Sequence, residues 1–294
     1  MKQTYTIMSL FVIAALMFTG CEKATDATED PSVLMEDAAE SISAAVGDES
    51  GGAVESMADV MIAGGGGSLG AAVPVMDGAD LVTAGPPVYD SVSGWWTVSV
   101  NRSRSNGLVE RSITREYKYR FLRNGVGQKH YITNGDTATM LKSWIVSGSG
   151  YFAGPRVSHA LTQLKGAWTA TDINKDTVTI TLDSTYVRAG TDTITTRLSK
   201  RTHTSTLTIT AVNVKAPRYR PAFSTAWRNN FANAISGTIS GRYVAAITFQ
   251  NGDLYKERNV DREFTLTVGG GNGSLTIGGN STRYSVDMMN GQRK

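Results

Sequence analysis

Cysteine and histidine are scarce in this sequence of 294 residues, which contains one Cys, at position 21, and three His. A single cysteine excludes a disulfide bond within the chain. His130, His159 and His203 lie far apart, and none has another His or a Cys at the spacing of a zinc site. We therefore expect neither a metal site nor a cofactor.

Motifs of catalysis are also missing. Residues 269–273 are rich in glycine, but no Lys-Ser or Lys-Thr pair ends the run, so we interpret them as a hairpin loop and not as a phosphate-binding loop. Residues 148–150 lack the Gly-x-Ser-x-Gly spacing of a hydrolase nucleophile. No pair of carboxylates stands out for sugar hydrolysis. We expect a protein that is not an enzyme.

Acidic and basic residues are distributed unevenly along the chain. Residues 22–90 contain 14 Asp and Glu but one basic residue, Lys23, whereas residues 91–294 contain 27 Lys and Arg and 12 Asp and Glu. This asymmetry predicts two regions, an acidic segment over 21–90 and a basic domain over 91–294. We interpret the acidic segment as a self-repelling tether. The alternative is that it docks on the basic domain.

The N-terminus has the features of a secretory signal, with Lys2 ahead of an apolar run over 7–18 and then two small residues before Cys21. Phe18-Thr19-Gly20-Cys21 resembles the lipobox of bacterial lipoproteins. The resemblance implies that residues 1–20 are a cleaved signal peptide and that Cys21 is lipidated, which would anchor the chain to a membrane of the bacterial cell envelope. Glu22 after the cysteine, in place of Asp, favours the outer membrane.

Two short helices are expected within the acidic segment. Asp30 is suited to cap the first, with Pro31 in the first helical position, and apolar residues then recur at helical spacing up to Ala45. The second runs from about Val54 to Ile62 and ends at a glycine run. Both are short enough to be weak helices on their own.

The basic domain has the pattern of an antiparallel β protein. Apolar and polar residues alternate with a period of two in several runs, such as 113–121 and 264–268, and Asn-Gly pairs predict tight hairpins. The Asn-Gly pairs begin at Asn124, Asn134, Asn251 and Asn272. We predict a mainly β fold, an antiparallel β-sandwich or partly open β-barrel of roughly 9–12 strands.

One stretch departs from the β pattern. Ser224 is suited to cap a short helix that carries Trp227, Phe231 and Ile235 at intervals of four residues, and Gly237 would end it. We expect this helix to cover an open end or an exposed face of the β structure.

Basic and aromatic residues are interleaved next to this helix. The candidate surface for an anionic partner consists of Arg218, Tyr219, Arg220, Trp227 and Arg228. Its expected partner is an anionic glycan or an envelope protein, and not nucleic acid, which is scarce outside the cytoplasm. The alternative is a structural cap with its aromatic rings turned inward and its arginines solvated.

A second basic run includes Arg102, Arg111, Arg115 and Arg123. Several of its members alternate with apolar residues, so we expect them to line the solvent face of a hairpin, where charge opposes edge-to-edge aggregation.

Together these patterns predict an envelope lipoprotein with a binding or structural role, in which the basic β domain contacts a protein, an anionic glycan or the membrane surface. The alternative is a carrier that holds a small hydrophobic ligand or lipid in a cavity of the β domain beneath the 224–235 helix.

Overall fold

The computed structural model describes residues 31–65, 81–105, 110–155, 157–195, 197, 199–278 and 282–294. The chain forms two compact units, Met1–Leu34 and Met35–Lys294. The second unit contains all the described strands and all the described helices except the first turn of the first helix. The expected signal peptide, Cys21 and the Asp30 cap lie outside the described residues. No described helix is both long enough and apolar enough to cross a membrane.

The described chain contains three α-helices, one 3-10 helix and sixteen strands. The helices are α2 (Pro31–Val46), α3 (Ala53–Gly64), η1 (Pro221–Phe223) and α4 (Ser224–Ala234). The strands are β1 (Leu81–Ala84), β2 (Val88–Asp90), β3 (Trp95–Ser105), β4 (Glu110–Arg123), β5 (Val126–Gln128), β6 (Ile132–Thr133), β7 (Asp136–Thr137), β8 (Met140–Ala153), β9 (Val157–Thr171), β10 (Thr177–Thr195), β11 (Lys200–Pro217), β12 (Ser236–Asn251), β13 (Leu254–Gly269), β14 (Asn272–Ile277), β15 (Arg283–Asp287) and β16 (Gln292–Arg293).

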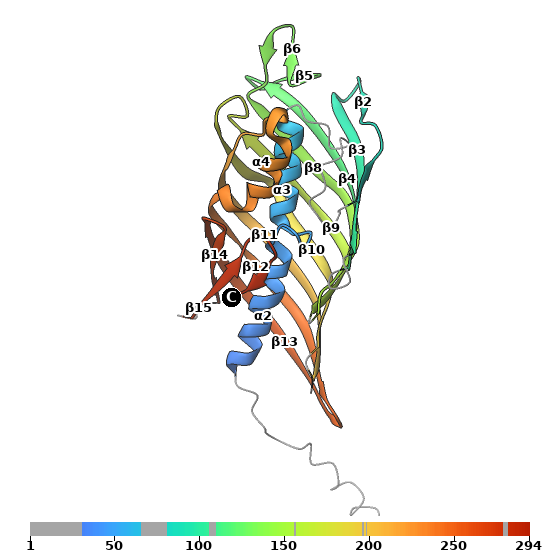
Figure 1. The fold of residues 1–294 in the computed structure, drawn as a ribbon, viewed down its shortest axis with the longest axis vertical. Helices are drawn as coiled ribbons and strands as arrows, with labels where there is room; N and C mark the ends of the chain where they lie inside the picture. The colour runs from blue at the N-terminus through green and yellow to red at the C-terminus, as the bar shows by residue number, and fades with distance from the viewer. Residues whose placement is uncertain are drawn as a thin grey trace, which may run out of the picture. The chain divides into compact units, whose positions relative to one another are not determined.

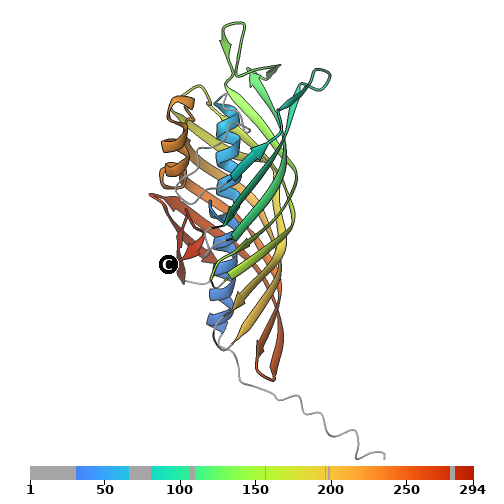
Figure 2. The same ribbon diagram turned by 45° about the vertical axis from the view of Figure 1, so that its right-hand side comes forward.

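Fourteen of these strands form one antiparallel sheet, and β6 and β7 form a separate hairpin. The sheet runs in the order β1-β3-β4-β8-β9-β10-β11-β12-β13-β14-β15-β16, with β2 and β5 paired to β3 and β4. Its two ends, β1 and β16, are not paired with each other among the described residues. The sheet curves around α2 and α3, and α4 lies beside α3 (Figures 1 and 2). The prediction of a mainly β, antiparallel fold is confirmed.

The period-two pattern of the sequence places one side of each strand in the interior. On β4 the buried positions include Ile113, Tyr117, Tyr119 and Phe121, as their alternation predicts. The two helices lie on the concave side of the sheet (Figure 2), where the Tyr117 hydroxyl donates to Asp59 on α3 and Ile113 lies beside Gly51 in the α2–α3 loop. The core therefore lies between the sheet and its own N-terminal helices.

The Asn-Gly pairs at 124–125 and 134–135 form tight turns, in which all four residues have positive φ. Asn272-Gly273, in contrast, belongs to β14, and the turn lies one step earlier, at Gly270 and Gly271, with φ of +59° and +78°. The hairpin loop predicted over 269–273 is therefore present, but its turn is at Gly270-Gly271 and not at Asn272-Gly273, because two glycines tolerate positive φ more readily than Asn-Gly does.

The boundary expected at residue 90 does not separate two units of the structure. All twelve residues of α3 are buried, and α2 is largely buried from Asp37 onward. Residues 35–65 are thus an interior part of the same unit as the strands and not a solvated spacer. The physical reason is that their carboxylates pair with arginines of the sheet. These contacts agree with the alternative interpretation, in which the acidic segment docks on the basic domain, and not with the solvated tether.

Candidate functional site

The segment that follows β11 gathers the predicted anionic-partner residues at one end of the sheet. Phe231 and Ile235 are buried, which fixes the inner face of α4. The ring of Trp227 lies between Tyr219 and Phe231, with centroids 5.1 and 4.8 Å away, and Trp227 Nε1 donates a 3.1 Å hydrogen bond to the carbonyl of Pro217. This aromatic column attaches α4 to the end of β11, so α4 is the covering helix that the spacing predicted.

Two of the five predicted surface residues, Tyr219, which is buried, and Arg228, which is half-buried, face the N-terminal helices. Tyr219 is buried and packs against the C-terminal end of α3, where a Cβ on Gly65 would come within 2.7 Å of the Tyr219 ring. Arg228 makes a two-pronged ion pair with Asp48, whose side chain is 1% exposed. Tyr219, just before η1, and Arg228, on α4, therefore join the segment around α4 to the α2–α3 hairpin, and both have partners within the protein.

Arg218 and Arg220 remain near the surface and are held by the loop between β9 and β10. Arg218 Nη1 donates to the carbonyl of Asn174 at 3.3 Å, and its guanidinium lies 5.5 Å from the centre of the Tyr131 ring. Arg220 Nη2 donates to Asp176 at 2.6 Å, in an ion pair that is exposed on both sides. Solvent weakens such a pair, so a competing anion can displace Asp176.

An open pocket of about 330 Å³ lies between these arginines and α4. It is lined by Pro217, Arg218, Arg220, Ala226, Trp227, Asn230 and Ala234. Three of the five predicted residues, Arg218, Arg220 and Trp227, therefore meet at one site. An apolar wall with two guanidinium groups can hold the face of a ring while pairing with an anionic group on it.

A second cluster of charged residues is buried between α3 and the sheet, and the sequence analysis did not predict it. Glu55 and Asp59, one turn apart on α3, have fully buried side chains that face β3 and β4. Arg102 Nη1 lies 3.2 Å from Glu55 and 3.0 Å from Asp59, and Arg115 Nη2 lies 2.8 Å from Glu55. Arg111 also pairs with Glu55. Burial alone would raise the pKa of Glu55, but these three arginines outweigh it and hold that pKa far below its ordinary value.

The expectation that this basic run lines a solvent face was therefore wrong for Arg102, Arg111 and Arg115, which are all buried. Arg111 and Arg115 have the same parity as the apolar residues of β4, so they point to the same side of the strand. Arg123 does lie near the surface, where it pairs with Asp136. The signal in the sequence was their odd numbering, which places Arg111 and Arg115 on the same side of β4 as the buried apolar residues.

Arginines also hold the loop between α2 and α3. Arg188 Nη1, from β10, donates to the carbonyl of Ala45 at 3.0 Å, Arg115 Nη2 to that of Gly51 at 2.6 Å, and Arg111 Nη1 to that of Glu49 at 2.7 Å. Buried carbonyl groups need such partners, and positive charge is favourable at the end of α2. The interior charges are therefore structural partners of the helical hairpin.

Two histidines lie in the same interior. His159 pairs with Asp192 and accepts a 3.2 Å hydrogen bond from Arg188 Nε at its Nε2 atom. His203 lies 3.3 Å from the Ser41 hydroxyl and 3.2 Å from that of Tyr243. Burial is the main cause that lowers the pKa of His203, to about 4, so its ring is neutral at pH 7.

Comparisons with known proteins find no match: no protein family matches the sequence, and neither a curated protein nor a solved structure is similar to it.

Proposed function

We propose that this chain is a lipid-anchored protein of the bacterial cell envelope that binds an anionic glycan without catalysing a reaction. Lipidation at Cys21 supplies the anchor, and the following Glu22 directs the protein to the outer membrane. The binding site is the pocket between β11 and α4. The observation that carries the proposal is the meeting of Arg218, Arg220 and Trp227 at one pocket with an apolar wall.

The chemistry of the pocket favours an acidic sugar over the other anionic partners considered. Its volume of about 330 Å³ is at the lower end of the range for small-ligand sites, which suits one or two sugar rings. Trp227 and Pro217 supply apolar surface against a ring face, and the two arginines supply paired donors for a carboxylate or phosphate.

The carrier alternative requires an apolar cavity under α4. That space is filled by the side chains of Tyr219 and Phe231 and by the end of α3. A larger pocket of about 510 Å³ lies beside the start of α2, but it is lined by charged residues that include Glu36, Asp37, Arg201 and Arg293. Neither arrangement favours a hydrophobic ligand.

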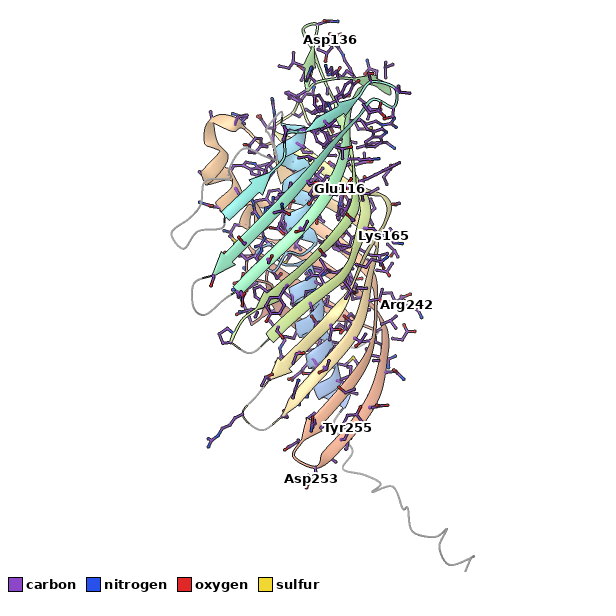
Figure 3. All side chains as sticks on the ribbon, turned by 90° about the vertical axis from the view of Figure 1, so that its right-hand side faces the viewer. Glu116, Asp136, Lys165, Arg242, Asp253 and Tyr255 are labelled. Atoms are coloured by element: carbon purple, nitrogen blue, oxygen red, sulfur yellow. The ribbon has the colours of Figure 1, made fainter. Side chains whose placement is uncertain are left out.

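The test is a titration of the mature chain, residues 21–294, with purified lipopolysaccharide and with a neutral glucan as the control ligand. The double variant Arg218→Gln/Arg220→Gln should lose at least about tenfold in affinity for lipopolysaccharide, the equivalent of one charge-assisted contact. Arg242→Gln is the matched control, because Arg242 is also exposed and paired with an aspartate, Asp261, on the outer face of β12 (Figure 3).

Affinity should also fall steeply with added salt. Equal affinities for the double variant and the Arg242→Gln control, or equal binding of the neutral glucan, would contradict the assignment of the pocket. The anchor is tested separately, by the intact mass of natively expressed protein and by release of Cys21→Ala from membranes.

A further inference from the structure

The compact unit of residues 35–294 has two distinguishable ends. The first turns of α2 after Leu34 and the β12–β13 hairpin lie at one end (Figures 1 and 2), where Asp37 of α2 pairs with Arg201 of β11, the register partner of Phe249 on β12. The pocket beside α4 and the β6–β7 hairpin lie toward the other end. Figure 3 labels Asp253 and Tyr255 on the β12–β13 hairpin and Asp136 on the β6–β7 hairpin, at opposite extremes.

We infer that the tip of the β12–β13 hairpin, residues 251–256, contacts the surface of the membrane to which the chain is anchored. This rests on the lipid anchor of the proposed function. Thirteen residues lie between Cys21 and Met35. Even a fully extended connection of that length reaches at most about 50 Å, and Pro31–Leu34 already belong to α2, which shortens it. Met35 and the hairpin beside it are thus the end of the unit that this short connection keeps nearest to the bilayer.

The tip carries exposed apolar surface of the kind that binds at a lipid interface. Leu254 is 44% exposed and Tyr255 is 57% exposed. Most large apolar side chains of this protein are buried instead, so these two stand out. Consecutive strand residues point to opposite faces, so the two side chains extend from both sides of the hairpin. A tyrosine with its ring among headgroups and its hydroxyl in water is typical of membrane interfaces.

The charges around the tip are mixed. Lys200, Lys256 and Arg258 lie on or beside it, together with Asp253 and Glu257, and Glu257 accepts a 2.6 Å hydrogen bond from the Tyr255 hydroxyl. This balance predicts contact with zwitterionic lipids that changes little with salt, unlike binding at the Arg218/Arg220 pocket.

The hydrogen bonding of β13 limits how deeply the tip can enter. β14 pairs with residues 264–269 of β13, so at the tip itself, at Leu254 and Tyr255, the outer edge of β13 has no strand partner among the described residues. Unpaired backbone groups are costly in hydrocarbon. The contact is therefore shallow, at the level of the headgroups, and it orients the domain with the α4 pocket facing away from the membrane.

Hydrogen exchange of the mature chain tests this contact. The Cys21 thiol is coupled to a maleimide lipid in phosphatidylcholine vesicles, so the experiment does not depend on acylation in the cell. Exchange of the amides of residues 251–256 should slow by roughly tenfold on vesicles relative to the uncoupled chain. The β6–β7 hairpin is an internal control, because it also has a tight turn and an exposed apolar residue, Ile132.

Leu254→Ser/Tyr255→Ser should abolish the slowing, whereas Val126→Ser/Ile132→Ser at the opposite end should leave it intact. Equal exchange in solution and on vesicles would overturn the inference. So would slowing that appears without vesicles at high protein concentration, which would indicate pairing of β13 edges between copies of the chain. Failure of native acylation would be seen in the mass spectrum and would leave this measurement unaffected.

Discussion

Glu55 Oε2 on α3 and Arg115 Nη2 on β4 lie 2.8 Å apart, and neither side chain is more than 1% exposed. This pair joins the acidic N-terminal segment to the basic sheet at a point that water does not reach. Buried pairs of this kind contribute modestly as pairs, but the loss of one partner leaves an uncompensated charge. That asymmetry determines how the protein should respond to mutation.

Glu55→Gln should lower the free energy of unfolding by about 3–5 kcal/mol, because three buried arginines lose their shared carboxylate. Urea unfolding followed by tryptophan fluorescence measures this change. Glu263→Gln, at an exposed position of β13, is the control and should change stability by less than about 0.5 kcal/mol. Similar losses in the two variants would contradict a structural role for the interior cluster.

His203 should make the protein less stable as the pH falls. Its pKa is lowered to about 4 in the folded state, so between about pH 6.5 and 4 the unfolded chain binds a proton that the folded chain does not. Stability should therefore drop by roughly 2 kcal/mol between pH 7 and pH 4.5 on account of this group. His203→Gln should show a correspondingly smaller drop, and an unchanged drop would refute the assignment.

Removal of the acidic helical segment should abolish cooperative folding. A chain that lacks residues 22–65 loses the carboxylates that face Arg102, Arg111 and Arg115 and should bind a hydrophobic dye in place of showing a thermal transition. A chain that lacks only residues 22–30 keeps every one of these contacts and should melt like the full mature chain. A normal thermal unfolding transition after deletion of residues 22–65 would instead support the interpretation of the acidic segment as a tether.

Gly237 and Gly125 offer a matched pair of substitutions. Both have positive φ, +140° and +81°, but a Cβ on Gly237 would lie 2.0 Å from the carbonyl oxygen of Asn213, whereas Gly125 is surrounded by open space. Gly237→Ala should therefore cost about 1–3 kcal/mol more than Gly125→Ala. Thermal melts of the two variants measure the difference, which reports on the close approach of β11 and the start of β12.

Much of the fold could be predicted from the sequence, because period-two alternation and the 227-231-235 spacing are local patterns. The helices over 31–46 and 53–64 were also visible as patterns. The position of these helices was not, since the pairing of Asp48 with Arg228 joins residues 180 positions apart. The parity of Arg111 and Arg115 did point inward, but a buried arginine is plausible only once its carboxylate partner is known.

The candidate site was predicted in part. Arg218, Arg220 and Trp227 were chosen for their interleaving, and the fold does bring them to one pocket. Tyr219 and Arg228 were assigned to the same surface because a sequence pattern cannot tell which side of a short helix faces another element. The contacts of Tyr219 with the end of α3 and of Arg228 with the α2–α3 loop decide that question.

The backbone N–H groups of Asp48 and Glu49 donate to the carbonyls of Met288 and Met289, so one of the earliest turns of the domain is bonded to almost the last residues of the chain. During synthesis the N-terminal helices emerge first, and more than two hundred further residues must follow before these bonds can form. The turn between α2 and α3 therefore stays incomplete until residues 288 and 289 have been made, which places the closing of this unit late in synthesis.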